Sequence, residues 1–259
     1  MNNEKSKPLI QVLERSLDIM EMLAESGTPM RSIDIAEKLG LRLQTVNNLL
    51  RTLYLRGYLS QDEHRNYRLG AQCFYIGSFA DRWSALRKAS KIPLQELSSV
   101  LEMGAFVGVI ENDKLLCVSL IEYGGEQYDL PRQLWAHELH STACGKLLLA
   151  NLSEKERERL LARMSRRKLT PETVTDAAEI ETMCQEIRRK GYAEAHGESA
   201  MGIHSAAVPI IGADGKLIGG VAVYSPTEQW DKISLAVKLE EMKLAAEKIS
   251  KKYVRTNAL

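Results

Sequence analysis

The sequence lacks the features of a secreted or membrane-anchored protein. No apolar run approaches the ~20 residues that a membrane-spanning helix requires. No hydrophobic stretch follows the charged N-terminus, so we expect no signal peptide. The four cysteines stand far apart without a C-x-x-C pair, which disfavours a zinc ribbon or a redox motif and favours reduced thiols. We therefore expect a cytoplasmic protein with no membrane partner.

Net charge is nearly absent as well. The 259 residues carry 35 Lys and Arg against 34 Asp and Glu, a formal charge of +1. This balance argues against a protein that coats nucleic acid through bulk positive charge, although it leaves room for a local basic face. An apolar content of 44% and a charged content of 27% are ordinary for a globular protein. The length favours two compact domains over one.

Residues 1–70 show the pattern of three helices followed by a hairpin. Apolar residues recur at helical spacing over about 11–26, 32–39 and 43–56. Glycine follows each of these runs, as is typical of helix ends. Two short strands around the polar residues 61–66 predict a hairpin. This order is typical of a winged helix-turn-helix domain, whose second motif helix enters the major groove of DNA.

The rest of the chain predicts a linker and an α/β domain. Residues 71–89 are interpreted as a linker helix, and Pro93 must either kink the helical stretch that follows or begin a new helix. Within residues 90–259 we expect hairpins at 104–120 and 204–224, and helices at about 142–150, 153–164, 176–190 and 230–251. The predicted fold class is α+β with two domains, the second built on an antiparallel sheet.

Charge is divided within the predicted N-terminal domain. Residues 10–40 carry three basic and six acidic side chains, whereas residues 42–68 carry five arginines and two acids. The recognition helix and the wing fall in the positive half. The near-zero total charge therefore conceals a local basic face, which favours contact with DNA.

The predicted recognition helix carries side chains that suit base readout. Amides bond adenine edges bidentately and arginine suits guanine, while basic residues at the wing tip suit phosphates or the minor groove. A solvated helix face is the alternative, but two adjacent asparagines inside a helix carry a cost that base contact would explain. The predicted DNA-binding residues are Arg42, Gln44, Thr45, Asn47, Asn48, Arg51, His64 and Arg65.

Several motifs follow one another along nearly the whole chain. They lie at residues 13–19, 35–41, 45–53, 57–58, 139–150, 191–193, 198, 202, 206–209 and 225–226. Together they resemble the IclR family of bacterial transcriptional regulators. The resemblance implies a GAF-like C-terminal domain that senses a small molecule, and dimers or tetramers on double-stranded operator DNA, with repression as the expected mode. Two departures are Arg42-Leu43-Gln44 in place of a small polar helix cap, and Glu138 in place of a proline.

A candidate effector pocket adjoins the predicted helix that begins near Ser141. Small residues there would let a carboxylate reach backbone N–H groups at a helix N-terminus, although simple capping and close packing explain the same residues equally well. The resemblance favours a ligand and implies pocket walls at Ala143, Cys144, Ala195, Ile203, Ser205, Ala222 and Tyr224. Family members that bind small oxo-acids tend to carry Asp, Cys, Ser and Ser at positions 195, 205, 222 and 224. We therefore expect an effector other than glyoxylate or pyruvate.

Other chemistry finds less support in the sequence. Gly145-Lys146 lacks the earlier glycine and the following Ser or Thr of a phosphate loop. His137 and His140 would face one metal if helical, but no third ligand is evident, and no cofactor is expected. No catalytic triad or G-x-S-x-G elbow occurs. The sequence predicts a ligand-responsive DNA-binding regulator and not an enzyme; the alternative is a small-molecule-binding or catalytic α/β protein whose N-terminal helices bind protein.

Overall fold

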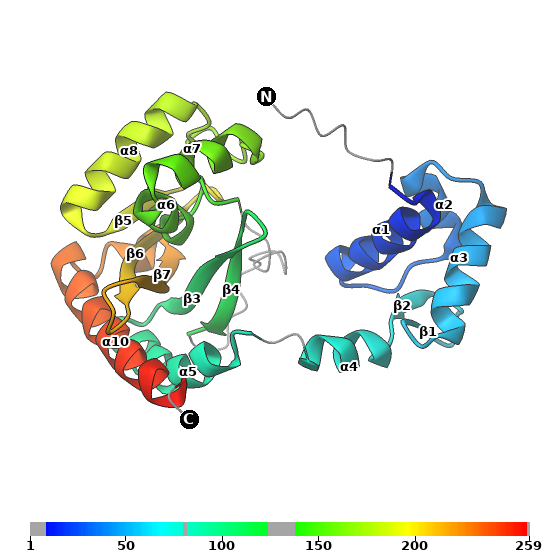
Figure 1. The fold of residues 1–259 in the computed structure, drawn as a ribbon, viewed down its shortest axis with the longest axis horizontal. Coiled ribbons are helices and arrows are strands. Elements are labelled where there is room, and N and C mark those ends of the chain that lie inside the picture. The colour runs from blue at the N-terminus through cyan, green and yellow to red at the C-terminus, as the bar shows by residue number, and fades with distance from the viewer. Residues whose placement is uncertain (1–8, 80–81, 124–137, 258–259) are drawn as a thin grey trace. The chain divides into compact units, whose positions relative to one another are not determined.

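A computed structural model of the chain describes residues 9–79, 82–123 and 138–257 (Figure 1). The chain consists of two compact units, and the boundary between them lies between Asp81 and Arg82. Over the described ranges, no helix combines the length and the apolar character needed to cross a membrane.

The N-terminal unit is a winged helix-turn-helix head, as the sequence predicts. Its elements are α1 (Gln11–Ser26), α2 (Ser32–Leu39), α3 (Leu43–Leu55), β1 (Leu59–Gln61), β2 (Tyr67–Leu69) and α4 (Ala71–Phe79). Gly40 adopts a left-handed φ of 63°, and its N–H bonds to carbonyls of the last turn of α2, so the chain turns sharply into α3. Arg42 precedes α3 and provides no side-chain cap, consistent with the weak cap expected from the sequence.

A small apolar core holds the head together. Ile19 from α1, Ile35 from α2, and Val46 and Leu50 from α3 are fully buried against one another. The hairpin joins this core through Leu59 of β1, and Met30 forms an isolated bridge with Tyr67 of β2. Burial of the apolar stripe of α3 leaves its polar stripe in solvent. We call this polar stripe, which runs from Gln44 to Arg51, the reading face.

The segment predicted as one linker helix consists of two helices in different units. The first is α4, which has no buried residue. The second, α5 (Ser84–Leu101), begins the C-terminal unit and buries Leu86 and Ala89 in its core. Pro93 lies inside α5 and is itself buried, so the helix continues through it. The apolar residues before Pro93 therefore serve the C-terminal core.

The C-terminal unit is built on one antiparallel sheet of five strands. In space the strands lie in the order β4 (Lys114–Ile121), β3 (Gly104–Glu111), β7 (Leu217–Pro226), β6 (Ile203–Ile211) and β5 (Ala193–His196). Both predicted hairpins are present, β3 with β4 and β6 with β7. The antiparallel sheet is thus confirmed, while the GAF-like character of the domain stays a prediction.

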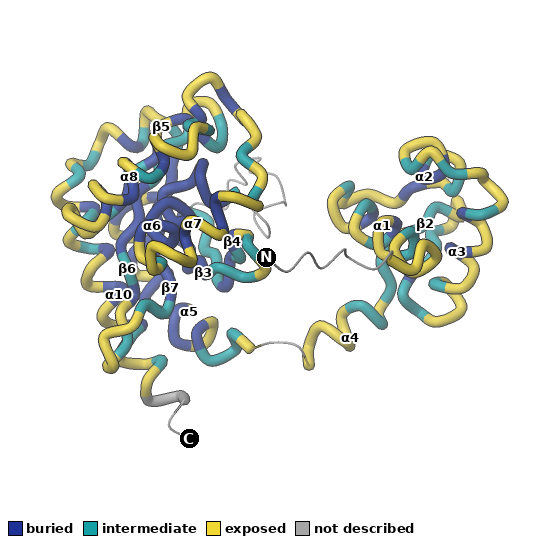
Figure 2. The backbone as a smooth tube through the Cα atoms, turned by 45° about the horizontal axis from the view of Figure 1, so that its top comes forward, coloured by how far each residue is buried: buried dark blue, intermediate teal, exposed yellow. Residues whose placement is uncertain are grey.

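Helices cover both faces of the sheet (Figure 1). One face packs on α5 and α10 (Leu235–Asn257). The other packs on α6 (Ala143–Asn151), with α7 (Glu154–Arg163) and α8 (Ala177–Lys190) completing that layer. Figure 2 shows the burial concentrated in the central strands and α6.

Strand alternation separates two apolar cores. In β6, Ala206 and Val208 face α5 and α10, whereas Ala207 faces α6. In β7, Val221 and Val223 belong to the first core, and Ala222 and Tyr224 to the second. Because successive side chains point to opposite faces, the register decides which residues α6 meets.

Two short elements were not expected from the sequence. Strand β5 pairs with β6 at the sheet edge, and α9 (Thr227–Trp230) is a single turn after β7. Residues 193–196, Ala-Glu-Ala-His, have little β-propensity, so their strand state depends on pairing with β6.

Candidate functional site

The exposed face of α3 gathers the predicted base-reading side chains. Gln44, Asn47, Asn48 and Arg51 are all exposed, and their spacing of three and four residues places them on one side of the helix. Thr45 is half-buried at the edge of this face, and Arg42 is exposed just before the helix. The structure therefore brings the predicted recognition set together as a polar surface.

The wing turn is held by one carboxylate. Asp62 accepts hydrogen bonds from the backbone N–H groups of His64 (2.9 Å) and Asn66 (2.8 Å), and from the Asn66 side chain (2.9 Å). The Asn66 side-chain bond is the main reason that the pKa of Asp62 is lowered. Arg65 has a left-handed φ of 61°, and both His64 and Arg65 are exposed at the tip. The wing thus presents two basic side chains on an ordered turn.

The arginines of the predicted DNA-binding set form no ion pair within the described head. In the described residues 9–79, the ion pairs join Arg31 to Asp34 and His64 to Glu63. Neither pair involves Arg42, Arg51 or Arg65. Their charges therefore face solvent, where phosphate groups can meet them.

The predicted effector residues also come together, on the sheet face that meets α6. Ala195 pairs with Ser205, and Ser205 pairs with Tyr224, so these residues form a row across β5, β6 and β7. Ala143 and Cys144 at the start of α6 are fully buried in the same core as Ala222. Ile203 is partly buried at its edge. We call this set the effector row.

Internal contacts occupy the start of α6. Thr142 caps the helix by accepting from the Gly145 N–H (3.0 Å), and the Ala143 N–H donates to Ser205 Oγ (3.4 Å). A side chain on Gly145 would collide with Leu139, since a Cβ there would lie 2.3 Å from its carbonyl oxygen. Capping and close packing therefore explain these small residues, and a ligand carboxylate would have to compete with Ser205 for the Ala143 N–H.

Large side chains fill the space beside the small ones. The Tyr224 ring lies over Gly104, where a Cβ would be 2.3 Å from Cζ, and its centroid is 6.1 Å from that of Phe106. Cys144 packs against Gly108 and Gly220, and burial strongly raises the pKa of its thiol. Four cavities among the described residues have linings that contain no residue of the effector row.

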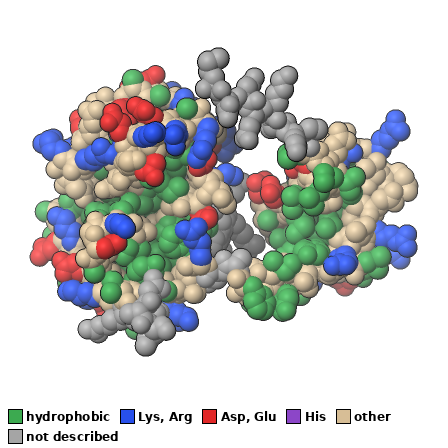
Figure 3. All heavy atoms as spheres, in the orientation of Figure 1, with side chains coloured by type: hydrophobic (Ala, Val, Ile, Leu, Met, Phe, Trp, Pro, Cys, Tyr) green, Lys and Arg blue, Asp and Glu red, His purple; other side chains and the backbone are tan. Residues whose placement is uncertain are grey.

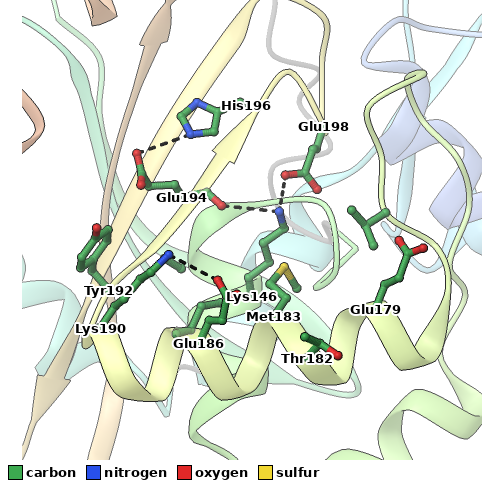
Figure 4. A pocket seen from close by; sticks show the side chains of 13 residues that line it. Lys146, Glu179, Thr182, Met183, Glu186, Lys190, Tyr192, Glu194, His196 and Glu198 are labelled. Carbon is green, nitrogen blue, oxygen red and sulfur yellow. Dashed lines mark hydrogen bonds and ion pairs between the residues drawn. The ribbon is translucent and has the colours of Figure 1, made fainter.

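One of those cavities, about 540 Å³ in volume, lies between α8 and β5 (Figure 4). Among the charged side chains of its lining, glutamates outnumber lysines, with Glu179 and Glu186 from α8, and Glu194 and Glu198 from β5 and the segment after it. Sequence reasoning did not identify it, because the helix pattern of α8 looks like an ordinary amphipathic surface.

A buried ion pair forms the inner wall of this cavity. Lys146 of α6 donates to Glu198 Oε1 and to the Glu194 carbonyl oxygen, as the dashed lines in Figure 4 mark. Only 3% of the Lys146 side chain is exposed, and burial lowers the pKa of its ammonium group. The Glu198 carbonyl is fixed by Thr173 Oγ1 at 2.7 Å. Lys146 is therefore a structural cation and not part of a phosphate loop.

Of the two histidines considered for a metal, the structure describes His140 alone. His137 lies outside the described residues, and His140 is fully buried, with Nε2 3.1 Å from the Arg167 carbonyl oxygen. Across the described ranges, no group of three or more His, Cys, Asp or Glu residues is placed to hold a metal ion. All four cysteines are free thiols.

Comparison with known proteins gives matches over both units. The IclR helix-turn-helix domain matches residues 12–63, and the bacterial transcriptional regulator IclR C-terminal domain matches residues 82–251. The HTH-type transcriptional regulator XynR of Escherichia coli K12 is 29% identical, over 94% of this chain and 97% of XynR. BhcR of Paracoccus denitrificans, also an HTH-type transcriptional regulator, is 28% identical, over 93% of this chain and 86% of BhcR.

Solved structures show the same fold. The IclR of Thermotoga maritima matches with a TM-score of 0.71 at 22% identity, covering 94% of this chain and 98% of its own. An IclR homolog from Microbacterium hydrocarbonoxydans, complexed with 4-hydroxybenzoate, matches with a TM-score of 0.80 at 20% identity, over 94% of this chain and 99% of its own.

Replacing Lys146 with methionine should destabilise the C-terminal unit by about 3–5 kcal/mol, because the Glu198 carboxylate would stay buried without its partner. The double variant Lys146→Met/Glu198→Leu should regain most of this loss. All three tryptophans lie in residues 82–259, so urea unfolding followed by tryptophan fluorescence measures the relevant unit. Equal stability of Lys146→Met and the unmodified chain would contradict a structural role for the pair.

Proposed function

Because the chain belongs to the IclR family of bacterial transcriptional regulators, we propose that α3 and the wing read an operator and that the protein represses transcription from it. The observation that supports this most directly is the face of α3 from Gln44 to Arg51. Its amide side chains are exposed, and its arginine forms no ion pair within the described head. Bidentate amides and arginines are the side chains that read base edges. Since bacterial operators lie in the cytoplasm, we expect the protein to act there.

We also propose that the protein binds DNA as a dimer or a tetramer of this chain. In the head, Phe74 and Phe79 of α4 are 83% and 77% exposed, and Val12, Leu13 and Leu17 of α1 are exposed too. Figure 3 shows hydrophobic side chains gathered on the face of the head that α1 and α4 form. Apolar surface of this kind is typical of interaction sites. A second copy is the occupant that a symmetric operator requires.

The C-terminal domain is the ligand-binding part of this family, and we propose that the effector row receives a small organic acid. The small side chains of Ala195 and Ala222 leave room only if Tyr224 or Phe106 moves, so binding would change how α6 packs on the sheet. The relative crystallised with 4-hydroxybenzoate supports an aromatic acid as the first ligand to test. A ligand can change the affinity for DNA only if it favours one packing of the C-terminal domain over another.

Replacing Asn48 or Arg51 with alanine should weaken specific DNA binding by about 1–3 kcal/mol for each bidentate bond to a base that the substitution removes. Binding to the DNA upstream of the protein's own gene is measured by fluorescence anisotropy at several salt concentrations. Arg189→Ala, which removes an exposed arginine from α8, is the matched control and should bind normally. Unchanged binding by both head variants would show that α3 reads no bases, and absence of salt-dependent binding in the unmodified chain would favour a protein partner.

Replacing Phe74 and Phe79 together with serine should shift the chain toward monomers, because the apolar face of α4 would lose its largest side chains. Sedimentation velocity gives the mass. Neither ring is buried within one chain, so folding should be unaffected. Leu244→Ser on α10, where the leucine is 47% exposed, is the control and should leave the mass unchanged. An unaltered assembly in the double variant would rule out α4 as an interface.

Replacing Ala195 with valine should abolish stabilisation by the effector, because the added methyl groups would occupy the effector row. Thermal shift compares 4-hydroxybenzoate and other aromatic or sugar acids with glyoxylate, and a ligand that binds only the folded state raises the melting temperature. Ala206→Val adds the same volume to the opposite core and should keep the ligand response. Equal responses in the two variants would place the effector elsewhere, and conversion of the ligand, followed by chromatography, would favour an enzyme.

A further inference from the structure

Two imidazole rings face each other at the edge of the C-terminal sheet. His196 of β5 and His204 of β6 are directly paired in the antiparallel register. Their Nδ1 atoms are 2.7 Å apart, and the ring centroids are 5.0 Å apart. The His196 side chain is 53% exposed, so solvent and ions can reach the pair.

The outer nitrogen of each ring contacts an oxygen that accepts hydrogen bonds. His204 Nε2 is 2.9 Å from Thr227 Oγ1, and that hydroxyl donates its own proton to the Gly202 carbonyl oxygen at 3.1 Å. His204 must therefore donate to Thr227. His196 Nε2 lies 3.4 Å from Glu194 Oε1, a carboxylate that only accepts (Figure 4).

The Thr227 contact places the N–H of a neutral His204 on Nε2 and leaves a lone pair on its Nδ1. Without a metal, the two Nδ1 atoms share a hydrogen bond of 2.7 Å in which His196 donates. A metal ion would take the place of that proton, and His196 would then carry its N–H on Nε2, which faces the Glu194 carboxylate at 3.4 Å. An oxygen beside each outer nitrogen is the arrangement that orients histidine ligands at metal sites.

We propose that His196 and His204 bind one divalent transition-metal ion through their Nδ1 atoms, with water completing the coordination. Metal–nitrogen bonds of about 2.0–2.1 Å at a right angle put two nitrogens about 2.9 Å apart, whereas tetrahedral geometry puts them about 3.3 Å apart. The observed separation is nearer the first value. Tetragonal nitrogen sites suit Ni²⁺ and Cu²⁺, and imidazole is a preferred ligand of both.

The surroundings add charge of both signs. The carboxylate of Glu194 contacts His196, and Asp231 acts on His204 from the end of α9. Lys238 is the opposing charge, and its ammonium donates to the carbonyl oxygens of Trp230 (2.6 Å) and Ile233 (2.5 Å). The two carboxylates outnumber this cation beside the pair, which favours a bound divalent ion.

A bound ion would fasten the sheet edge. It would join β5 to β6, while Thr227 holds His204 to the start of α9. Ala195 and Ser205, the neighbours of these histidines in the chain, point to the opposite face and belong to the effector row. The proposed ion therefore lies behind the effector row, on the other side of the same strands.

Isothermal titration of the untagged full chain with Ni²⁺ tests the site. We expect one ion per chain, and at least a tenfold loss of affinity in both His196→Ala and His204→Ala. Thr227→Val should also weaken binding, by roughly 10–100-fold, because it removes the acceptor that orients His204. His64→Ala changes an exposed histidine of the head and should bind Ni²⁺ normally.

Tryptophan fluorescence gives an independent measurement with Cu²⁺. The His204 ring is stacked on Trp230 with centroids 5.9 Å apart, so a bound paramagnetic ion should quench that indole. Trp230→Phe should lose this quenching and still bind Cu²⁺ in the calorimeter. Melting curves without metal establish that each variant is folded. If the unmodified chain binds no ion, or both histidine variants bind as it does, the pair shares a proton and the proposal is wrong.

Discussion

Strand alternation in the five-stranded sheet is the constraint on which the C-terminal unit depends. Odd and even residues of β6 and β7 serve separate cores, so one register determines both the helix layer that each side chain meets and the members of the effector row. A slip of one residue would exchange the two cores and bring His204 to the face of α6. The effector row and the histidine pair therefore depend on the same pairing of β5 with β6.

Close approach of α6 to the sheet depends in turn on residues without side chains. A Cβ on Gly108 would lie 2.7 Å from Cys144 Sγ, and one on Gly220 would lie 3.0 Å from it. The same helix carries Ala143 of the effector row and, one turn later, Lys146 at the wall of the cavity against α8. Because α6 is a rigid element, movement at its start would also change the distance between Lys146 and Glu198. The proposed effector would therefore act on the buried ion pair through α6.

Long periodic segments were predictable from the sequence, and short or context-dependent ones were not. The three helices of the head, both hairpins and the helices at 143–190 follow from apolar periodicity and glycine ends. Strand β5 was missed because Ala-Glu-Ala-His becomes a strand only beside β6. The opening helix of the second domain was predicted from residue 90, whereas α5 begins at Ser84. The residues of the reading face and of the effector row could be named from the sequence motifs and the family resemblance. The cavity beside α8 could not, because it depends on contacts between residues far apart in the chain.

Charge distribution connects the two units in function. A net charge of +1 gives the whole chain little general attraction for DNA, so a single head would rely on the few exposed groups of α3 and the wing tip. Linking two heads makes the second binding event intramolecular, which raises the overall affinity without any new contact to DNA. That gain depends on the spacing of the heads, because a linkage that cannot span both half-sites gives none. In the proposed dimer or tetramer, the affinity for DNA would therefore change with any effector that alters how the heads are spaced.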